Sequence, residues 1–183
     1  MVDDLAARII TVPDPALVLL VGPAGAGKST LARRCFSSDE VISSDELRRR
    51  LSGDEADQSV SGLAFRILHA HVGRRLAAGS LTVVDATNVE HQARRALVDI
   101  ARAAGVPAVA VVLDVDLETC LEQNGRRPGR TVEREVIERQ AASLRSSLGD
   151  AGLAVEGFAA VHRLATPAEI AAVSFERDVS HPR

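Results

Sequence analysis

Short apolar runs alternate with longer amphipathic stretches along most of the chain. The amphipathic stretches predict helices, and two of them, 59–78 and 89–104, end just before a glycine that can terminate a helix. The apolar runs predict buried strands, and they cover Ala16–Val21, Glu40–Ser43, Leu81–Asp85, Ala108–Asp114 and Ala159–Leu164. This alternation predicts an α/β fold with a mostly parallel sheet of about five strands and helices on both faces. Ligands bind such sheets at the carboxyl ends of the strands.

The first of these strands leads into the segment "GPAGAGKST", which contains the pattern G-x-x-x-x-G-K-S. Glycines in this pattern let backbone N–H groups surround phosphates, the lysine reaches the β- and γ-phosphate oxygens, and the hydroxyl binds Mg²⁺. A predicted strand before the motif and a helix-forming run behind it supply the expected context. The motif predicts a P-loop that binds Mg·ATP, with Ser29 as the Mg²⁺ ligand, and its nucleotide-binding residues are Gly22, Gly25, Ala26, Gly27, Lys28, Ser29 and Thr30.

Lys28 is the only lysine in the chain, whereas the other 21 basic residues are arginines. A lysine ammonium is compact, and a guanidinium is a larger planar group that would not fit the same narrow space. We therefore interpret Lys28 as a chemical requirement and expect it to be catalytic.

The segment "EVISSDELRRR" follows the second predicted strand. Asp45 lies where a helix begins, and Arg48, three residues later, shares its helix face. The pair makes a candidate functional site at the edge of the sheet where ligands bind. A structural interpretation is also open, in which Ser44 caps the helix and Asp45 stabilises its first turn through the helix dipole.

Asp85 ends the third predicted strand, in "LTVVDATN". A carboxylate at this position is typical of a Walker B aspartate, which holds Mg²⁺ directly or through water and lies beside the substrate. The alternative is an ordinary strand-end aspartate, with Asn88 capping the following helix.

A further segment, "NGRRPGRTVERE", separates a short helix, 117–124, from a longer one that starts near Thr131. Its glycines and proline interrupt helix, while Arg126, Arg127 and Arg130 concentrate positive charge. Phosphoryl transfer needs cations on the migrating group, and a mobile arginine lid supplies them. An arginine-rich surface loop without a catalytic role is the alternative.

Composition limits the remaining possibilities. With 183 residues, 46% hydrophobic content and a net charge of -3, the chain suits one domain without a broadly basic DNA-coating surface. Aromatic residues make up 2%, too few for long single-strand binding. Cys35 and Cys120 lack metal-site spacing and indicate buried thiols. An acidic start and the lack of a long apolar run favour a cytoplasmic protein without membrane contact. We expect a core over residues 13–173 and a loose tail over the last ten residues.

Taken together, the motifs resemble the kinase domain of bacterial polynucleotide kinase-phosphatase, an RNA end-healing enzyme. The similarity rests on "GPAGAGKST", on "ISSD" with Arg48, on "DEADQ", on "VVDATN" with Ala93 and Arg94 behind it, and on the arginine lid. It implies transfer of the γ-phosphate of ATP to the 5′-hydroxyl of RNA or DNA. It also implies that Asp45 is the general base, that Arg48 holds the phosphate beside the acceptor nucleoside, and that Arg127 and Arg130 form the lid.

The resemblance leaves alternatives open. The large bacterial proteins continue into further domains, so a free-standing relative could have changed its acceptor. A P-loop kinase of a small alcohol or an antibiotic would use the same Lys28, Ser29 and Asp45. An ATP-binding switch without transfer activity is the alternative of another class. Assembly as a homo-oligomer stays open.

Overall fold

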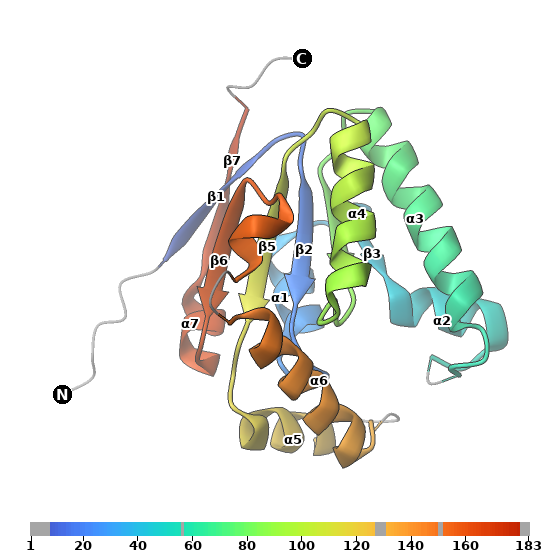
Figure 1. Ribbon diagram of the computed structural model, residues 1–183, viewed down its shortest axis with the longest axis vertical. Coiled ribbons are helices and arrows are strands. Elements are labelled where there is room, and N and C mark those ends of the chain that lie inside the picture. Colours follow the sequence, from blue (N-terminus) through green and yellow to red (C-terminus); the bar gives the residue numbers. More distant parts are fainter. Residues whose placement is uncertain (1–7, 56, 127–130, 150–151, 180–183) are drawn as a thin grey trace.

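The protein is described by a computed structural model that covers residues 8–55, 57–126, 131–149 and 152–179 (Figure 1). Its strands are β1 (Ile9–Pro13), β2 (Leu17–Val21), β3 (Val41–Ser43), β4 (Thr82–Asp85), β5 (Ala108–Leu113), β6 (Ala160–Leu164) and β7 (Ser174–Asp178). Its helices are α1 (Lys28–Cys35), α2 (Ser44–Ser52), α3 (Ser61–Ala77), α4 (His91–Ala103), α5 (Leu117–Gly125), α6 (Arg134–Ser147) and α7 (Pro167–Ala172), with a 3₁₀ turn, η1 (Leu153–Glu156).

A five-stranded parallel sheet forms the centre of the fold, in the order β3-β4-β2-β5-β6. All five strands predicted from apolar runs are present within a residue or so of the predicted bounds, and the α/β class is confirmed. The central strands β2 and β5 are fully buried, as expected for a parallel sheet covered on both faces.

Alternate residues of β2 enter two separate cores because strand side chains point to opposite faces of the sheet. Val18 and Leu20 pack with Leu31 of α1 on one face. Leu17, Leu19 and Val21 pack with side chains of α3 and α4 on the other, among them Leu68, Val72, Leu97 and Val98. Figure 1 shows α3 and α4 side by side on that second face.

The two ends of the described chain form a second sheet, which the sequence did not reveal. β1 pairs in parallel with β7, so the expectation of a loose tail is wrong for Ser174–Asp178. β7 has little apolar character of its own, and its pairing depends on a partner at the opposite end of the sequence. Ile10 and Val12 of β1 are buried, so the core also begins earlier than residue 13.

Candidate active site

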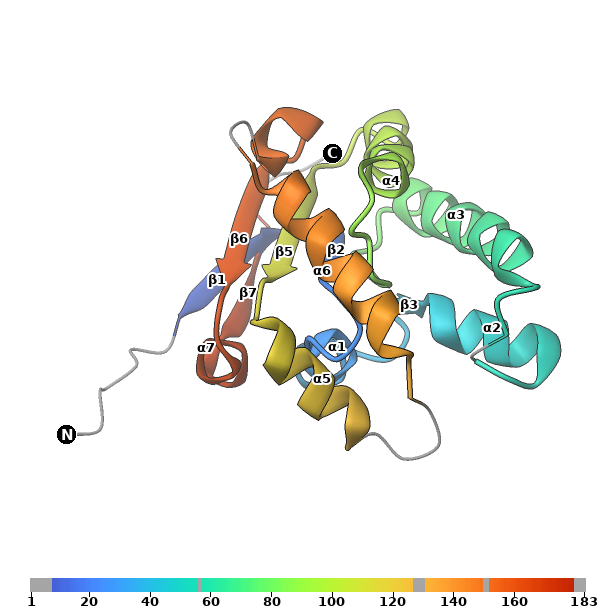
Figure 2. The ribbon, with the colours of Figure 1, turned by 60° about the horizontal axis from the view of Figure 1, so that its bottom comes forward.

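A cavity of about 690 Å³ opens at the carboxyl ends of the parallel strands, where ligands bind in open α/β sheets. One side of it, which we call the phosphate wall, consists of the P-loop and the end of β4: Ala24, Gly25, Gly27, Lys28, Ser29, Thr30, Asp85, Ala86 and Thr87. A second side comes from α2, α3 and the segment between them, and we call it the acceptor wall because the sequence analysis expects the acceptor there: Ser44, Asp45, Arg48, Gln58 and Phe65. Residues of α5, α6 and the segment before α6 close a third side, including Gln123, Val132, Val136, Arg139 and Gln140. In Figure 2, α5 and α6 pass in front of α1, and α2 lies to the right of them.

The P-loop connects β2 to α1 and takes its shape from glycine. Gly25 and Gly27 have φ values of 82° and 95°, which L side chains rarely adopt. A Cβ at Gly25 would also overlap the backbone carbonyl of Cys120 in α5. Gly22 and Ala26, both expected to bind nucleotide, do not line the cavity: Gly22 donates its N–H to the carbonyl of Thr87 (2.9 Å), and Ala26 is buried in the core.

Lys28 is 8% exposed and begins α1. Its ammonium donates hydrogen bonds to the carbonyl oxygens of Gly22 (2.8 Å) and Pro23 (2.7 Å). The cation is therefore held inside the curve of the P-loop, at the positive end of a helix whose first turn contains no acidic residue. This arrangement favours the binding of a polyanion.

Asp45 and Arg48 form an ion pair in the first turns of α2, as their spacing predicts. Arg48 is 6% exposed, and its Nε also donates to the carbonyl of Glu55 (2.9 Å). The buried guanidinium of Arg48 thus holds the Asp45 carboxylate at the border of the cavity. The helix cap is Ser43, whose hydroxyl accepts from the N–H of Glu46, and not Ser44 as the structural interpretation had it.

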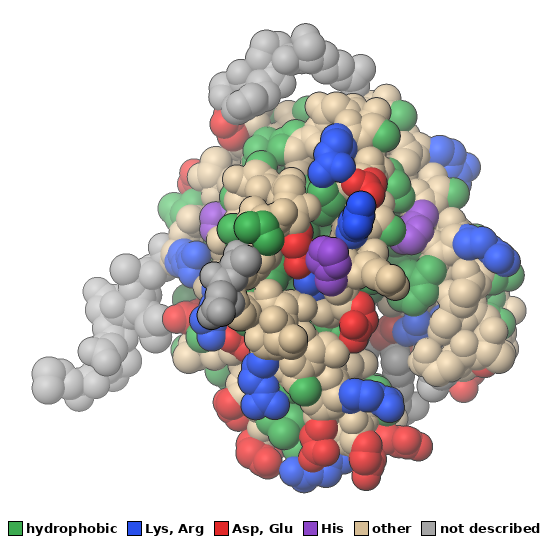
Figure 3. All heavy atoms as spheres, in the orientation of Figure 1, with side chains coloured by type: hydrophobic (Ala, Val, Ile, Leu, Met, Phe, Trp, Pro, Cys, Tyr) green, Lys and Arg blue, Asp and Glu red, His purple; other side chains and the backbone are tan. Residues whose placement is uncertain are grey.

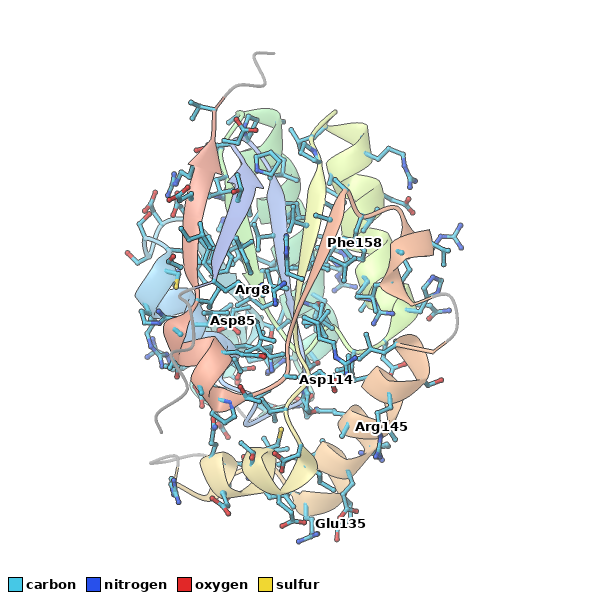
Figure 4. The ribbon with its side chains drawn as sticks, turned by 90° about the vertical axis from the view of Figure 1, so that its left-hand side faces the viewer. Arg8, Asp85, Asp114, Glu135, Arg145 and Phe158 are labelled. Atoms are coloured by element: carbon cyan, nitrogen blue, oxygen red, sulfur yellow. The ribbon has the colours of Figure 1, made fainter. Side chains whose placement is uncertain are left out.

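Asp85 lies between the two walls because of the sheet register. It is paired with Leu20, just before the P-loop, on one side and with Ser43, just before α2, on the other. Its side chain is 7% exposed and borders the cavity with Ser29, and Figure 4 shows it within the fold at the end of its strand. A carboxylate and a hydroxyl in one cavity are a donor set that suits Mg²⁺.

The segment after β4 is held by hydrogen bonds to β2 and to the side chain of Arg94 in α4. Asn88, with φ at 49°, donates its side-chain amide to the carbonyl of Leu20 (2.8 Å) and does not cap α4, which begins after Glu90. Arg94, which has no exposed surface, donates to the carbonyls of Asn88 (2.9 Å) and Val89 (2.7 Å) and to both carboxylate oxygens of Glu156. The pair Arg94–Glu156 thus holds the loop that follows Asp85.

Sequence reasoning did not single out Glu156, because it lies 62 residues after Arg94 in a short turn without a motif. Gln140 of α6 was missed as well. Its side-chain oxygen accepts from the N–H of Ala24 in the P-loop (2.8 Å), which connects α6 to the phosphate wall. The only available signal was its place on the inner face of an amphipathic helix.

Arg127 and Arg130, the expected lid arginines, lie outside the residues that the structure describes. The two ends of the segment are joined by Asn124, whose side chain exchanges two hydrogen bonds with the backbone of Val132. Arg126 is exposed and pairs with Glu122 on α5. Figure 3 shows acidic and basic side chains intermixed over this lower end of the molecule, where Glu118 and Glu138 also pair with Arg134.

Cys120 faces the P-loop from α5 and is buried. Burial raises the pKa of its thiol to about 11, although the charge of Lys28 acts in the opposite direction. The thiol is therefore protonated at neutral pH and unsuited to nucleophilic chemistry.

Residues 17–147 match the family model described as an AAA domain. The chain belongs to this family. The match spans the P-loop, both walls and all of α6, and the solved structures described below share the fold, so the chain has the fold of P-loop kinases. Among the described residues no helix is long and apolar enough to cross a membrane.

Solved structures with the same fold include several kinases. A chain of the Pnkp1/Rnl/Hen1 RNA repair complex is 21% identical with a TM-score of 0.63, over 74% of this chain and 46% of that one. A gluconokinase from Sinorhizobium meliloti 1021 is 18% identical with a TM-score of 0.56, over 87% of each chain. Chaetomium thermophilum Kti12 in complex with ADP-AlF3 is 20% identical with a TM-score of 0.63, over 85% and 93%.

One curated relative, a shikimate kinase from Corynebacterium efficiens, is 43% identical over 60 residues, which is 30% of this chain and 36% of the relative. The chain thus spans less than half the length of this relative and of the repair-complex chain. These likenesses establish the fold, and the similar proteins include a shikimate kinase, a gluconokinase and a chain of an RNA repair complex.

Proposed function

We propose that this protein is a polynucleotide 5′-hydroxyl kinase that transfers the γ-phosphate of ATP to 5′-hydroxyl ends of RNA or DNA, in nucleic-acid end repair. The observation that carries the proposal is the acceptor wall, where the Asp45 carboxylate, paired with the buried Arg48, borders the same cavity as Lys28. The fold shared with a chain of an RNA repair complex also supports it.

The arrangement assigns a role to each group. Asp45 orients the 5′-hydroxyl and takes its proton as the hydroxyl oxygen bonds to the γ-phosphorus. The bond from that phosphorus to the β–γ bridging oxygen breaks, and ADP leaves with the electron pair. Lys28 and the P-loop N–H groups stabilise charge on the phosphate oxygens, and Arg127 and Arg130 would add cations from the lid. Arg48 would hold the phosphate next to the acceptor nucleoside.

The residues present fit Mg·ATP. Gly25, Gly27, Lys28, Ser29 and Thr30 form a cradle along the cavity, in which a side chain at Gly25 would have no room. Ser29 and Asp85 would hold Mg²⁺, Asp85 directly or through water. When bound, this ion neutralises charge on the phosphates and orients them.

A second candidate is a kinase of a small-molecule alcohol. It is favoured by the 43% identity to a shikimate kinase over 60 residues and by the gluconokinase fold. Such an enzyme would use the same phosphate wall with another acceptor. Asp45, Arg48 and Gln58 would then bind hydroxyl or carboxylate groups of the small molecule.

Transfer of labelled γ-phosphate decides between the two. We expect short 5′-hydroxyl RNA and DNA oligonucleotides to be labelled far faster than gluconate, shikimate or a panel of other alcohols. A nucleoside 3′-phosphate should also be a much better acceptor than the bare nucleoside, because Arg48 would hold that phosphate. Labelling of a small alcohol alone would contradict the proposal, and ATP binding without transfer to any acceptor would indicate a nucleotide-dependent switch.

Asp45→Asn tests the base directly, with Asp99→Asn as the matched control because Asp99 is an exposed carboxylate on α4. Asparagine can still orient the hydroxyl but cannot accept its proton, so we expect a loss of ~100-fold or more in transfer. ATP affinity and the melting temperature should stay near those of the control. An active Asp45→Asn enzyme would exclude Asp45 as the base and leave Asp85 as the next candidate.

A further inference from the structure

Phe65 is the one aromatic residue that borders the cavity, and all four phenylalanines of the chain lie in its described part. The other three are committed to packing. Phe36 and Phe175 contact each other with ring centroids 4.8 Å apart. Phe158 is 9% exposed and belongs to the core on the α3–α4 face of the sheet. In Figure 4 the labels of Phe158 and Asp85 stand on different parts of the fold.

Phe65 itself has two environments. It is half-buried and packs against the core that contains Leu68 and Val72, its neighbours on the same face of α3. The rest of the side chain borders the cavity, which is also lined by the apolar Val132 and Val136 on its third side and by polar and charged residues on the acceptor wall. Apolar surface that stays in contact with water in such a cavity is unfavourable, and a ligand that covers it recovers this free energy.

The position of Phe65 in the cavity indicates which part of a bound acceptor would contact its ring. α3 packs beside α2, which carries Asp45 and Arg48, and Gln58 from the segment between the two helices lines the cavity as well. An acceptor whose 5′-hydroxyl lies at Asp45 and whose next phosphate lies at Arg48 leaves its first base for the remaining apolar part of this wall.

We infer that Phe65 stacks on the base of the acceptor's 5′-terminal nucleotide and thereby selects nucleic-acid ends over aliphatic alcohols. The inference rests on the proposed function and deepens it. Every base has a flat π-face that an aromatic ring accepts without regard to sequence. A polyol such as gluconate would instead lose water from its hydroxyls against the ring without gaining hydrogen bonds.

The test compares two acceptors that differ only in this base. One is a 5′-hydroxyl oligonucleotide, and the other carries an abasic tetrahydrofuran residue at its 5′ end, with the same phosphates. With the wild-type protein we expect the abasic acceptor to lower kcat/KM by about 5- to 150-fold, the range found for base–aromatic stacking. Most of the loss should appear in KM, because the base does not take part in the reaction.

Phe65→Ala completes the comparison. It should lower kcat/KM on the normal oligonucleotide by about the same factor, while its normal and abasic acceptors should differ by less than about 3-fold. The KM for ATP should not change. Phe65→Leu retains most of the core packing and should behave like the alanine variant towards the two acceptors. Leu63→Ala is the matched control, since Leu63 is 42% exposed on α3 and does not line the cavity.

The outcomes are distinct. Equal use of normal and abasic ends by the wild-type protein would overturn the stacking and leave the kinase function intact. A full abasic penalty in both Phe65 variants would also overturn it, because the base would then be recognised elsewhere. If neither oligonucleotide is phosphorylated while a small alcohol is, the proposed function fails and the stacking fails with it.

Discussion

The phosphate wall and the acceptor wall of the cavity are built in different ways. The phosphate wall depends on backbone: glycines with positive φ, N–H groups at the start of α1, and a lysine held by two carbonyl oxygens. The acceptor wall depends on the side chains that α2 and α3 carry. A backbone cradle tolerates few changes of sequence, whereas a side chain on a helix can change without altering the fold.

This difference explains why proteins of one fold include a gluconokinase and a chain of an RNA repair complex. What these proteins share with this chain is the fold. In the function that we propose, the group that receives the phosphate contacts the acceptor wall, so the identity of the acceptor has to be tested by changes on that wall. Changes on the phosphate wall should abolish transfer to any acceptor.

The largest effect is expected at Lys28. Removing the ammonium in Lys28→Ala leaves the developing charge on the phosphates without its nearest cation, and we expect a loss of about 1000-fold or more in transfer. Lys28→Arg should fail as well, because the buried space between the carbonyls of Gly22 and Pro23 fits an ammonium. Rates with saturating ATP and acceptor measure this, and near-normal activity of the arginine variant would contradict it.

The second-largest effect is expected for Gly25→Ala. This variant tests whether the backbone conformation of the P-loop determines phosphate binding. A Cβ there meets the carbonyl of Cys120 at a φ of 82°, so either the loop or α5 must move. We expect a loss of ~100-fold or more in transfer, comparable to the loss of an oxyanion donor. ATP affinity should fall in parallel, as measured by titration.

Gly62→Ala is the control for this substitution. Gly62 lies in the first turn of α3 with open space around its Cα, so alanine should be accommodated there without loss of stability or transfer. A Gly25→Ala protein that binds ATP normally would show that the P-loop can adjust, and the contrast between the two walls would be weaker than we infer.

Substitutions in the buried pair Arg94–Glu156 should have effects of intermediate size on stability and on phosphate transfer. Glu156→Ala leaves a buried guanidinium without its partner and should lower the free energy of unfolding by about 3–5 kcal/mol. Replacing both residues, as Arg94→Met with Glu156→Leu, should restore much of that stability, since apolar groups can replace a buried ion pair. The double variant still lacks the donor to the carbonyls of Asn88 and Val89.

We therefore expect the double variant to fold and yet to transfer phosphate about 10-fold more slowly, because the loop after Asp85 has lost its support. The loss should appear in kcat at saturating substrates and not in the KM of the acceptor. Urea unfolding and steady-state rates on the same preparation separate the two effects. A stable double variant with normal kcat would show that the pair serves folding alone.

The two walls also differ in how far the sequence predicts them. The P-loop, Asp45 with Arg48, and Asp85 lie at the expected edge of the sheet because each stands at or just after the end of a parallel strand, and parallel strands end at one edge. Their roles in transfer stay predictions. Gln140 contacts the P-loop from α6, and Glu156 supports the loop after Asp85 through Arg94; both are distant in sequence from their partners, and no local pattern marks such contacts. For the same reason the pairing of β1 with β7 could not be predicted, since β7 gains its partner only in the folded chain.

The smallest effect that we expect is on the pH dependence of stability. It involves two histidines: His69 in α3, the helix that carries Phe65, and His162 in β6, which is remote from both walls. Burial lowers the pKa of His69 in α3 below its ordinary value of 6.5. It does the same for His162 in β6, helped by the nearby charge of Arg8, and the Nε2 atom of His162 is buried without a hydrogen-bond partner.

Because both folded-state pKa values are lowered, the unfolded chain takes up these protons at a higher pH than the folded protein does. Stability is therefore complete above a pH of about 6.5 and falls as the pH is lowered below that value, until the folded histidines are protonated too. We expect the melting temperature to drop between pH 7.5 and 5.5, with a smaller drop in His69→Gln and in His162→Gln. If His69→Gln shows the wild-type pH dependence while His162→Gln does not, α3 does not shield its histidine from water.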